Sequence, residues 1–168
     1  MHLIGGKKKK TNEQVIEEII LEQYNQYYRL AMSYVKAEAD AFDIVQNGVY
    51  KALRSSHTLK QQEYAKTWVY RIILNEIFAF LRKPRHDSYE FLQETKGYEE
   101  ASIEDNYEDI DLQKALDTLS EEEKAIVIMK YFEDKKLEEI ADVLEENLST
   151  VKSKLYRSMK KLKIHLEQ

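Results

Sequence analysis

The chain has 168 residues, no cysteine, one proline, four glycines and a formal net charge of −5. Without cysteine it has no disulfide and no thiolate-bound metal, and its histidines lack ligand spacing, so we expect no metal, no cofactor and no catalytic site. No apolar run approaches the ~20 residues that a membrane helix needs. The lysine-rich start lacks the apolar core of a secretory signal. The composition predicts an all-α, cytoplasmic protein.

The charges are unevenly distributed along the chain. Residues 1–83 hold 13 Lys and Arg against 9 Asp and Glu, whereas residues 84–118 hold 3 against 11. Residues 152–168 carry six basic residues and one acidic residue. Domains that bind nucleic acid by themselves are usually basic overall. We therefore expect weak DNA binding by the free chain and a partner that delivers it to DNA.

The first half of the chain predicts three helices after a basic tail, residues 1–11. The pattern Thr11-Asn12-Glu13-Gln14 has the form of a capping box and begins a helix that runs to about residue 36. A second helix is expected over residues 38–55. Gly48 lies on its apolar side at a cost of about 1 kcal/mol against alanine, so we expect another helix to cross closely there. The opposite face of the second helix is polar and includes Asp43, Gln46, Asn47, Tyr50 and Arg54.

The third helix, residues 62–83, carries an unusual stripe opposite its apolar face. At helical spacing it combines aromatic, guanidinium and amide groups: Tyr64, Trp68, Arg71, Asn75 and Arg82. Such a face suits stacking on unpaired bases, and the preceding loop would form the wall of a pocket for an extruded base. A core tryptophan with an exposed basic edge explains the same pattern without nucleic acid.

After Pro84, residues 84–111 show no sustained apolar period and predict an acidic, flexible linker. The apolar pattern returns in a second small domain, residues 112–168, which contains a capping signal at Ser120–Glu123. Its end reads as a helix-turn-helix over residues 137–166. One side of the last helix is apolar: Val151, Leu155, Met159, Leu162 and Leu166.

The other side of this last helix combines small polar residues with lysine and arginine, as in a recognition helix that lies in the major groove of DNA. A plain helical hairpin with a solvated basic face is the alternative. The turn carries Glu145 where glycine with positive φ is common, and a residue other than glycine costs about 1–2 kcal/mol there.

Two sets of motifs resemble bacterial sigma factors. Residues 40–47, DAFDIVQN, resemble the signature of sigma region 2, and TWVYRI at residues 67–72, with Asn75 and FLRK at residues 80–83, resembles the segment that follows it. Residues 131–134, 137–144 and 150–155 resemble region 4. No region between the two resembles the folded third domain of housekeeping sigma factors. The chain is therefore similar to the extracytoplasmic-function (ECF) group.

The resemblance implies three sets of site residues. A docking segment for core RNA polymerase matches Asp43, Ile44, Val45, Gln46 and Asn47. The segment that recognises and melts the promoter −10 element matches Arg54, Ser55, Ser56, His57, Lys66, Trp68, Tyr70, Arg71 and Asn75. On the helix that reads the −35 element we place Ser149, Thr150, Lys152, Ser153, Lys154, Arg157 and Lys160.

The implied partners are core RNA polymerase, through its β′ clamp helices and β flap, promoter DNA and a membrane-anchored anti-sigma factor. No small-molecule substrate is expected. The function implied is promoter-specific transcription initiation in an envelope-stress regulon. The competing interpretation is a helix-turn-helix regulator that works without polymerase and binds palindromic duplex DNA tightly. A small helical enzyme would need a convergent polar pocket, and the sequence offers no candidate.

Overall fold

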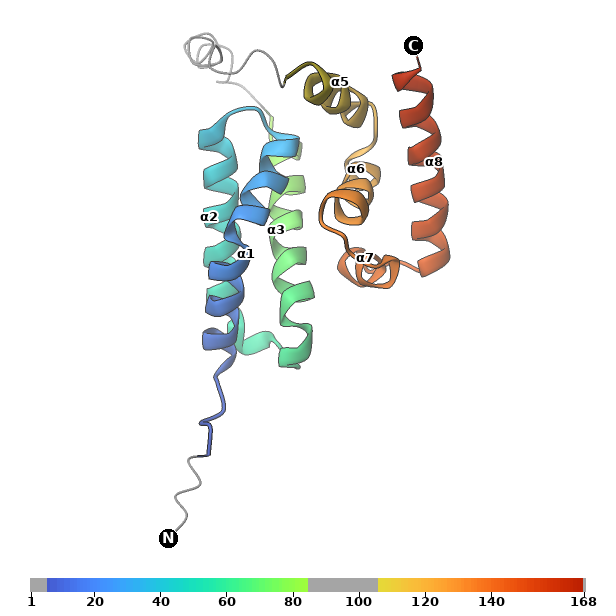
Figure 1. Cartoon of the computed structure of the whole chain (residues 1–168). Coiled ribbons are helices and arrows are strands. Elements are labelled where there is room, and N and C mark those ends of the chain that lie inside the picture. The colour runs from blue at the N-terminus through green and yellow to red at the C-terminus, as the bar shows by residue number, and fades with distance from the viewer. Residues whose placement is uncertain (1–5, 85–105, 168) are drawn as a thin grey trace.

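The structure is a computed structural model that describes residues 6–84 and 106–167. Across these residues it contains helices and no strands, in two groups that lie side by side (Figure 1). The prediction of an all-α fold with two small helical domains is confirmed. In the same two segments, no helix has the length and apolarity needed to cross a membrane.

The N-terminal domain is a bundle of α1 (Asn12–Tyr34), α2 (Glu38–Arg54) and α3 (Ala65–Arg82). The predicted capping box begins α1: Thr11 Oγ1 accepts from the Gln14 backbone N–H at 3.2 Å, and Gln14 Oε1 accepts from the Thr11 N–H at 3.0 Å. Two short 3₁₀ turns, η1 (Ser56–Thr58) and η2 (Gln62–Tyr64), connect α2 to α3. The expected loop around His57 is therefore partly helical, and α3 itself begins at Ala65.

Gly48 lets α2 and α3 cross closely, as its position on the apolar side predicted. A Cβ atom built on Gly48 would lie 2.5 Å from Ile73 Cδ1 and 3.5 Å from Ile73 Cα. Ile73 is completely buried. The buried side chain of Ile73 therefore fills the space that a side chain at residue 48 would need.

The C-terminal domain consists of α5 (Asn106–Asp117), α6 (Glu121–Val127), η5 (Ile128–Phe132), α7 (Leu137–Leu144) and α8 (Leu148–Leu166). The capping signal is confirmed: Ser120 Oγ accepts from the Glu123 N–H at 3.2 Å. Helix α5 begins before Asp111, inside the stretch expected to be linker. The rest of the expected linker, residues 85–105, lies outside the described residues, as do residues 1–5 and 168.

The helix-turn-helix forms as predicted, around Ile140 of α7 and Val151 and Leu155 of α8, all buried. Two expected core residues of α8 are instead exposed, Met159 by 37% and Leu166 by 53%. Ser158 is completely buried in their place, and its hydroxyl donates to the Lys154 carbonyl oxygen at 2.6 Å.

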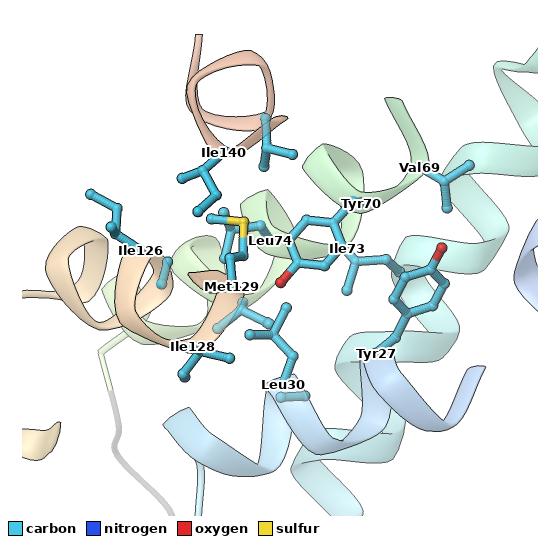
Figure 2. Close-up of a cluster of buried hydrophobic side chains, with 14 of the residues drawn as sticks. Tyr27, Leu30, Val69, Tyr70, Ile73, Leu74, Ile126, Ile128, Met129 and Ile140 are labelled. Carbon is cyan, nitrogen blue, oxygen red and sulfur yellow. The ribbon is translucent and has the colours of Figure 1, made fainter. Parts of the chain in front are cut away.

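One apolar core continues from the first domain into the second. Figure 2 shows this region: Met129 lies beside Tyr70 and Leu74 of α3, with Leu30 of α1 below and Ile140 of α7 above. Met129 and Ile140 are completely buried. Because small domains alone bury a limited apolar area, this shared core stabilises both domains.

We predict that Gly48→Ala destabilises the chain, because overpacking a core typically costs 1–3 kcal/mol and outweighs the gain of about 1 kcal/mol in helix propensity. Ile73→Val removes the atom that the new methyl group would meet. The double variant should therefore be more stable than the sum of the single effects predicts, by at least ~0.5 kcal/mol. Urea unfolding of the four proteins measures this coupling, and strict additivity would contradict the close crossing.

Candidate nucleic-acid interface

The polar face of α2 is open to solvent. Asp43, Gln46 and Asn47 are exposed, and Gln46 Nε2 donates to the Tyr24 hydroxyl on α1 at 3.1 Å. Ile44 and Val45, which were expected to contact polymerase, are 2% and 0% exposed. Their side chains hold α2 in the bundle, so only the polar residues of this segment form a surface that a partner reaches.

The residues assigned to the −10 element divide into exposed and covered positions. Arg54, His57, Lys66 and Asn75 are exposed, whereas Ser55, Ser56, Trp68 and Arg71 are half-buried. Tyr70 is only 2% exposed and points into the shared core (Figure 2). Tyr70 lies one residue before Arg71 and therefore does not belong to the stripe of α3.

The Tyr70 hydroxyl connects the two domains by donating to Glu133 Oε2 at 2.8 Å. Burial raises the pKa of the Glu133 carboxyl, against the opposing effects of the Tyr70 hydrogen bond and of Lys135 and Arg29. Burial, together with the charge of Glu133, also raises the pKa of Tyr70 well above its usual value. Ionisation of the Glu133 carboxyl therefore costs free energy in the domain interface.

Arg71 is the most heavily engaged residue of the stripe. Its Nε donates to the Val143 carbonyl oxygen at 3.1 Å, and its Nη2 donates to the Asp142 carbonyl oxygen at 2.5 Å. These are among the last carbonyls of α7, where cations are favoured. Glu145 takes the left-handed conformation that is common for glycine at such a turn, with φ 54°, and its Oε1 lies 3.4 Å from Arg71 Nη1. Each of the three guanidinium nitrogens therefore contacts the second domain.

Two grooves run along the domain interface on either side of Arg71. One, of about 590 Å³, has Tyr64 and Trp68 on the first domain and Asp142, Glu145 and Glu146 on the second. The other, of about 660 Å³, places Asn75 and Arg82 opposite a wall that includes Glu121, Glu122 and Glu145. The stripe that suits unpaired bases thus faces carboxylates, which repel phosphates.

Most of the polar face of α8 is open to solvent. Thr150 is half-buried and the other small polar and basic residues on this face are exposed: Ser149, Lys152, Ser153, Arg157 and Lys160. Helix α8 lies on the side of the C-terminal domain away from α1–α3 (Figure 1). This face is available to duplex DNA in the arrangement described here.

Lys154 differs from its neighbours on α8. Its Nζ donates to Glu122 Oε2 at 2.8 Å and to Glu146 Oε1 at 2.7 Å, and the side chain is 21% exposed. Burial alone would lower the pKa of Lys154, but the hydrogen bonds to both carboxylates raise it. Lys154 therefore ties α8 to α6 and to the turn that precedes α8, and its charge is neutralised within the domain.

Sequence reasoning did not find the polar contacts at the other end of the domain interface. The Tyr34 hydroxyl donates to the Glu121 carbonyl oxygen at 2.6 Å, and Gln113 Nε2 donates to the Ser33 carbonyl oxygen at 3.1 Å. Lys124, only 5% exposed, donates to the same Ser33 oxygen and pairs with Asp117 at 2.8 Å. A lysine in an acidic helix start carries no signal of burial, so only the folded structure identifies it.

A helical bundle with an aromatic and basic stripe, followed by a helix-turn-helix, defines a two-domain class of nucleic-acid-binding protein. The sigma-70 region 2 family matches residues 19–86, and the sigma-70 region 4 family matches residues 109–162. The RNA polymerase sigma factor SigV of Bacillus subtilis is 42% identical over 166 residues, which cover 95% of this chain and 96% of that protein. The chain belongs to the sigma-70 family, in its ECF group.

Other relatives agree with this family. The ECF RNA polymerase sigma factor SigE of Mycolicibacterium smegmatis is 30% identical over 89% of this chain and 61% of its own length. Two solved structures share the fold. Bartonella quintana RpoE, in complex with the anti-sigma factor NepR, matches with a TM-score of 0.67 and 21% identity, and the match covers 90% of this chain and 96% of that chain. CnrH, in complex with the cytosolic domain of CnrY, matches with a TM-score of 0.68 and 18% identity, and the match covers 90% of this chain and 87% of that chain.

The ion pairs of Lys154 lead to a prediction about duplex binding by α8. Lys152→Ala and Arg157→Ala should each lower the slope of log affinity against log salt by roughly 0.9, as expected for one lost phosphate contact. Lys154→Ala should leave the slope unchanged and lower the free energy of unfolding by about 1–3 kcal/mol, because Glu122 and Glu146 lose their shared partner. Promoter binding by the polymerase complex over a salt series tests this, and an equal loss of slope for Lys154→Ala would place Lys154 on the DNA.

Proposed function

We propose that the chain binds core RNA polymerase through the exposed polar face of α2, melts and reads the −10 element with the Arg54–His57 loop and the stripe of α3, and reads the −35 element with the exposed face of α8. The presence of these three surfaces on one chain, in the order that region 2 and region 4 require, carries the proposal. The polymerase supplies the chemistry, and we assign no catalytic activity or cofactor to this chain. This function would place the protein in the cytoplasm.

The compact arrangement is too small to contact both promoter elements at once. The elements lie about 25 base pairs apart by definition, or roughly 85 Å at 3.4 Å per base pair. A folded chain of this length has a radius of gyration of about 15 Å. The domains must therefore separate when both elements are bound.

The closed arrangement is accordingly the resting form. It buries Tyr70 in the interface, occupies Arg71 with the carbonyls of α7 and faces the α3 stripe with carboxylates. The free energy of polymerase binding has to offset the cost of exposing the shared apolar core around Met129 and Leu74 to water. Weak DNA binding by the free chain, expected from its net charge, also follows from this masking of the stripe.

An anti-sigma factor is the partner that would keep the chain in this resting form. The two solved structures with the same fold are titled as sigma factors in complex with anti-sigma factors. We propose a membrane-anchored anti-sigma factor for this chain, and an envelope-stress regulon under its control. It would act by adding contacts to both domains and so raising the cost of their separation.

The docking role of α2 is tested with Asp43→Ala combined with Gln46→Ala. The double variant should compete poorly with wild type for core polymerase while its helical content is unchanged, because both side chains are exposed. Glu17→Ala with Asn25→Ala, which removes one acid and one amide from exposed positions of α1, is the matched control. Undiminished competition by the α2 variant would remove this face from the polymerase interface. Tight binding of free wild-type protein to palindromic duplexes would favour the polymerase-independent regulator instead.

The resting form is tested through Glu133. Because burial raises the pKa of this carboxyl, the closed form gains stability as pH falls and loses it as pH rises through the raised pKa. Glu133→Gln removes the charge and leaves an oxygen that accepts from Tyr70. It should raise Tm at pH values above the raised pKa and slow assembly with core polymerase, and the gain in Tm should shrink as the pH is lowered through that pKa.

Glu138→Gln, which neutralises an exposed glutamate of α7, is the matched control and should change neither quantity. A lower Tm for Glu133→Gln, or a gain that grows as pH falls, would show that the ionised carboxylate stabilises the interface. Faster assembly with polymerase in the same variant would contradict the closed arrangement as the resting form.

A further inference from the structure

The loop that would receive an extruded −10 base is held from behind by one side chain at the start of α1. Asn12 Nδ2 donates to the Ser56 carbonyl oxygen at 3.0 Å and to the Leu59 carbonyl oxygen at 2.8 Å. These two carbonyls belong to the turn η1 and its end. Both N–H groups of the Asn12 amide are thus directed to the backbone of a segment more than 40 positions away.

The remaining polar atom of the Asn12 amide is also used. Gln62 Nε2 donates to Asn12 Oδ1 at 3.0 Å and to the Lys10 carbonyl oxygen at 2.9 Å. Gln62 begins η2, on the other side of the loop. A fully hydrogen-bonded amide therefore connects the start of α1 to both 3₁₀ turns, and it is partly shielded from water, which strengthens these bonds.

The outer side of the same loop is open. Arg54 and His57 are exposed, while Leu59 is buried at 7% exposure and anchors the segment in the core. The Thr58 backbone N–H donates to the Ser55 carbonyl oxygen at 2.9 Å, which tightens the turn. Asn12 and Gln62 hold the inner, backbone side and leave the outer groups free for a ligand.

We propose that Asn12 is a positioning residue for promoter opening: through the carbonyls of Ser56 and Leu59 it keeps the Arg54–His57 loop in the shape that captures an extruded base. The inference rests on the proposed function of that loop and adds a residue outside every motif of region 2. Capturing a base has to offset an unstacking cost of a few kcal/mol. A loop that is ordered beforehand binds with less entropic cost than one that is ordered on binding.

Asn12→Asp isolates this role. The carboxylate has the same shape and still accepts from Gln62, but it replaces the N–H groups that face the two carbonyls with an oxygen, which those carbonyls repel. An acid in the first turn favours α1 through the helix dipole, so the helix itself is retained. Gln14→Ala is the matched control, because it removes the side chain that completes the capping box at the same helix end without touching the loop.

The experiment uses the complex of the full chain with core polymerase on a promoter library randomised in the −10 element, with permanganate reactivity of −10 thymines as the measure of opening. His57→Ala identifies the base position that the loop reads. Asn12→Asp should slow opening roughly tenfold, as expected for the loss of two hydrogen bonds, and weaken the preference at that base position. Preference at the −35 element should stay unchanged.

Each outcome decides the matter. If Asn12→Asp opens promoters with the wild-type rate and preference, or changes them no more than Gln14→Ala, Asn12 has no positioning role. If Asn12→Asp fails to fold, Gln62→Met, which removes the donors that orient the Asn12 amide, takes its place and should weaken the same base preference. A wild-type chain that supports no transcription with core polymerase would instead refute the proposed function itself.

Discussion

The packing of α3 against α7 and η5 is the contact on which the rest of this structure depends. It joins the apolar cores of two domains, through Leu74 and Met129, and places the donor groups of Arg71 on the final carbonyls of α7. Neither domain is large enough to bury much apolar surface alone. In the proposed function the same surface of α3 serves promoter DNA, so the contact that stabilises the free chain also masks the proposed −10 face.

The distribution of acids explains why this masking is specific. The wall opposite the α3 stripe contains Asp142, Glu145 and Glu146, and the stripe contributes a guanidinium group. Glu145 has a left-handed backbone, a conformation that costs about 1–2 kcal/mol without glycine. Its carboxylate lies near Arg71, so the position that strains the turn also adds charge complementarity to the domain interface.

Positioning residues recur behind both proposed DNA-reading surfaces. Lys154 connects α8 to Glu122 and Glu146, and Asn12 connects α1 to the Arg54–His57 loop. Each uses all or most of its donor groups within the protein. The groups left free for nucleic acid are the outward ones, such as Arg157 and His57. A basic side chain in a recognition helix is therefore not by itself evidence of a phosphate contact.

The sequence by itself determined the helices, both capping boxes, the close crossing at Gly48 and the family, because these depend on neighbours within a few residues along the chain or on ordered motifs. Only the tertiary structure decided that Tyr70 is buried, that Lys154 is neutralised and that Arg71 is occupied. Arg71 and the Val143 carbonyl are 72 positions apart in the chain. Helical periodicity shows which face of a helix is apolar or polar, but it holds no information about which distant segment meets that face.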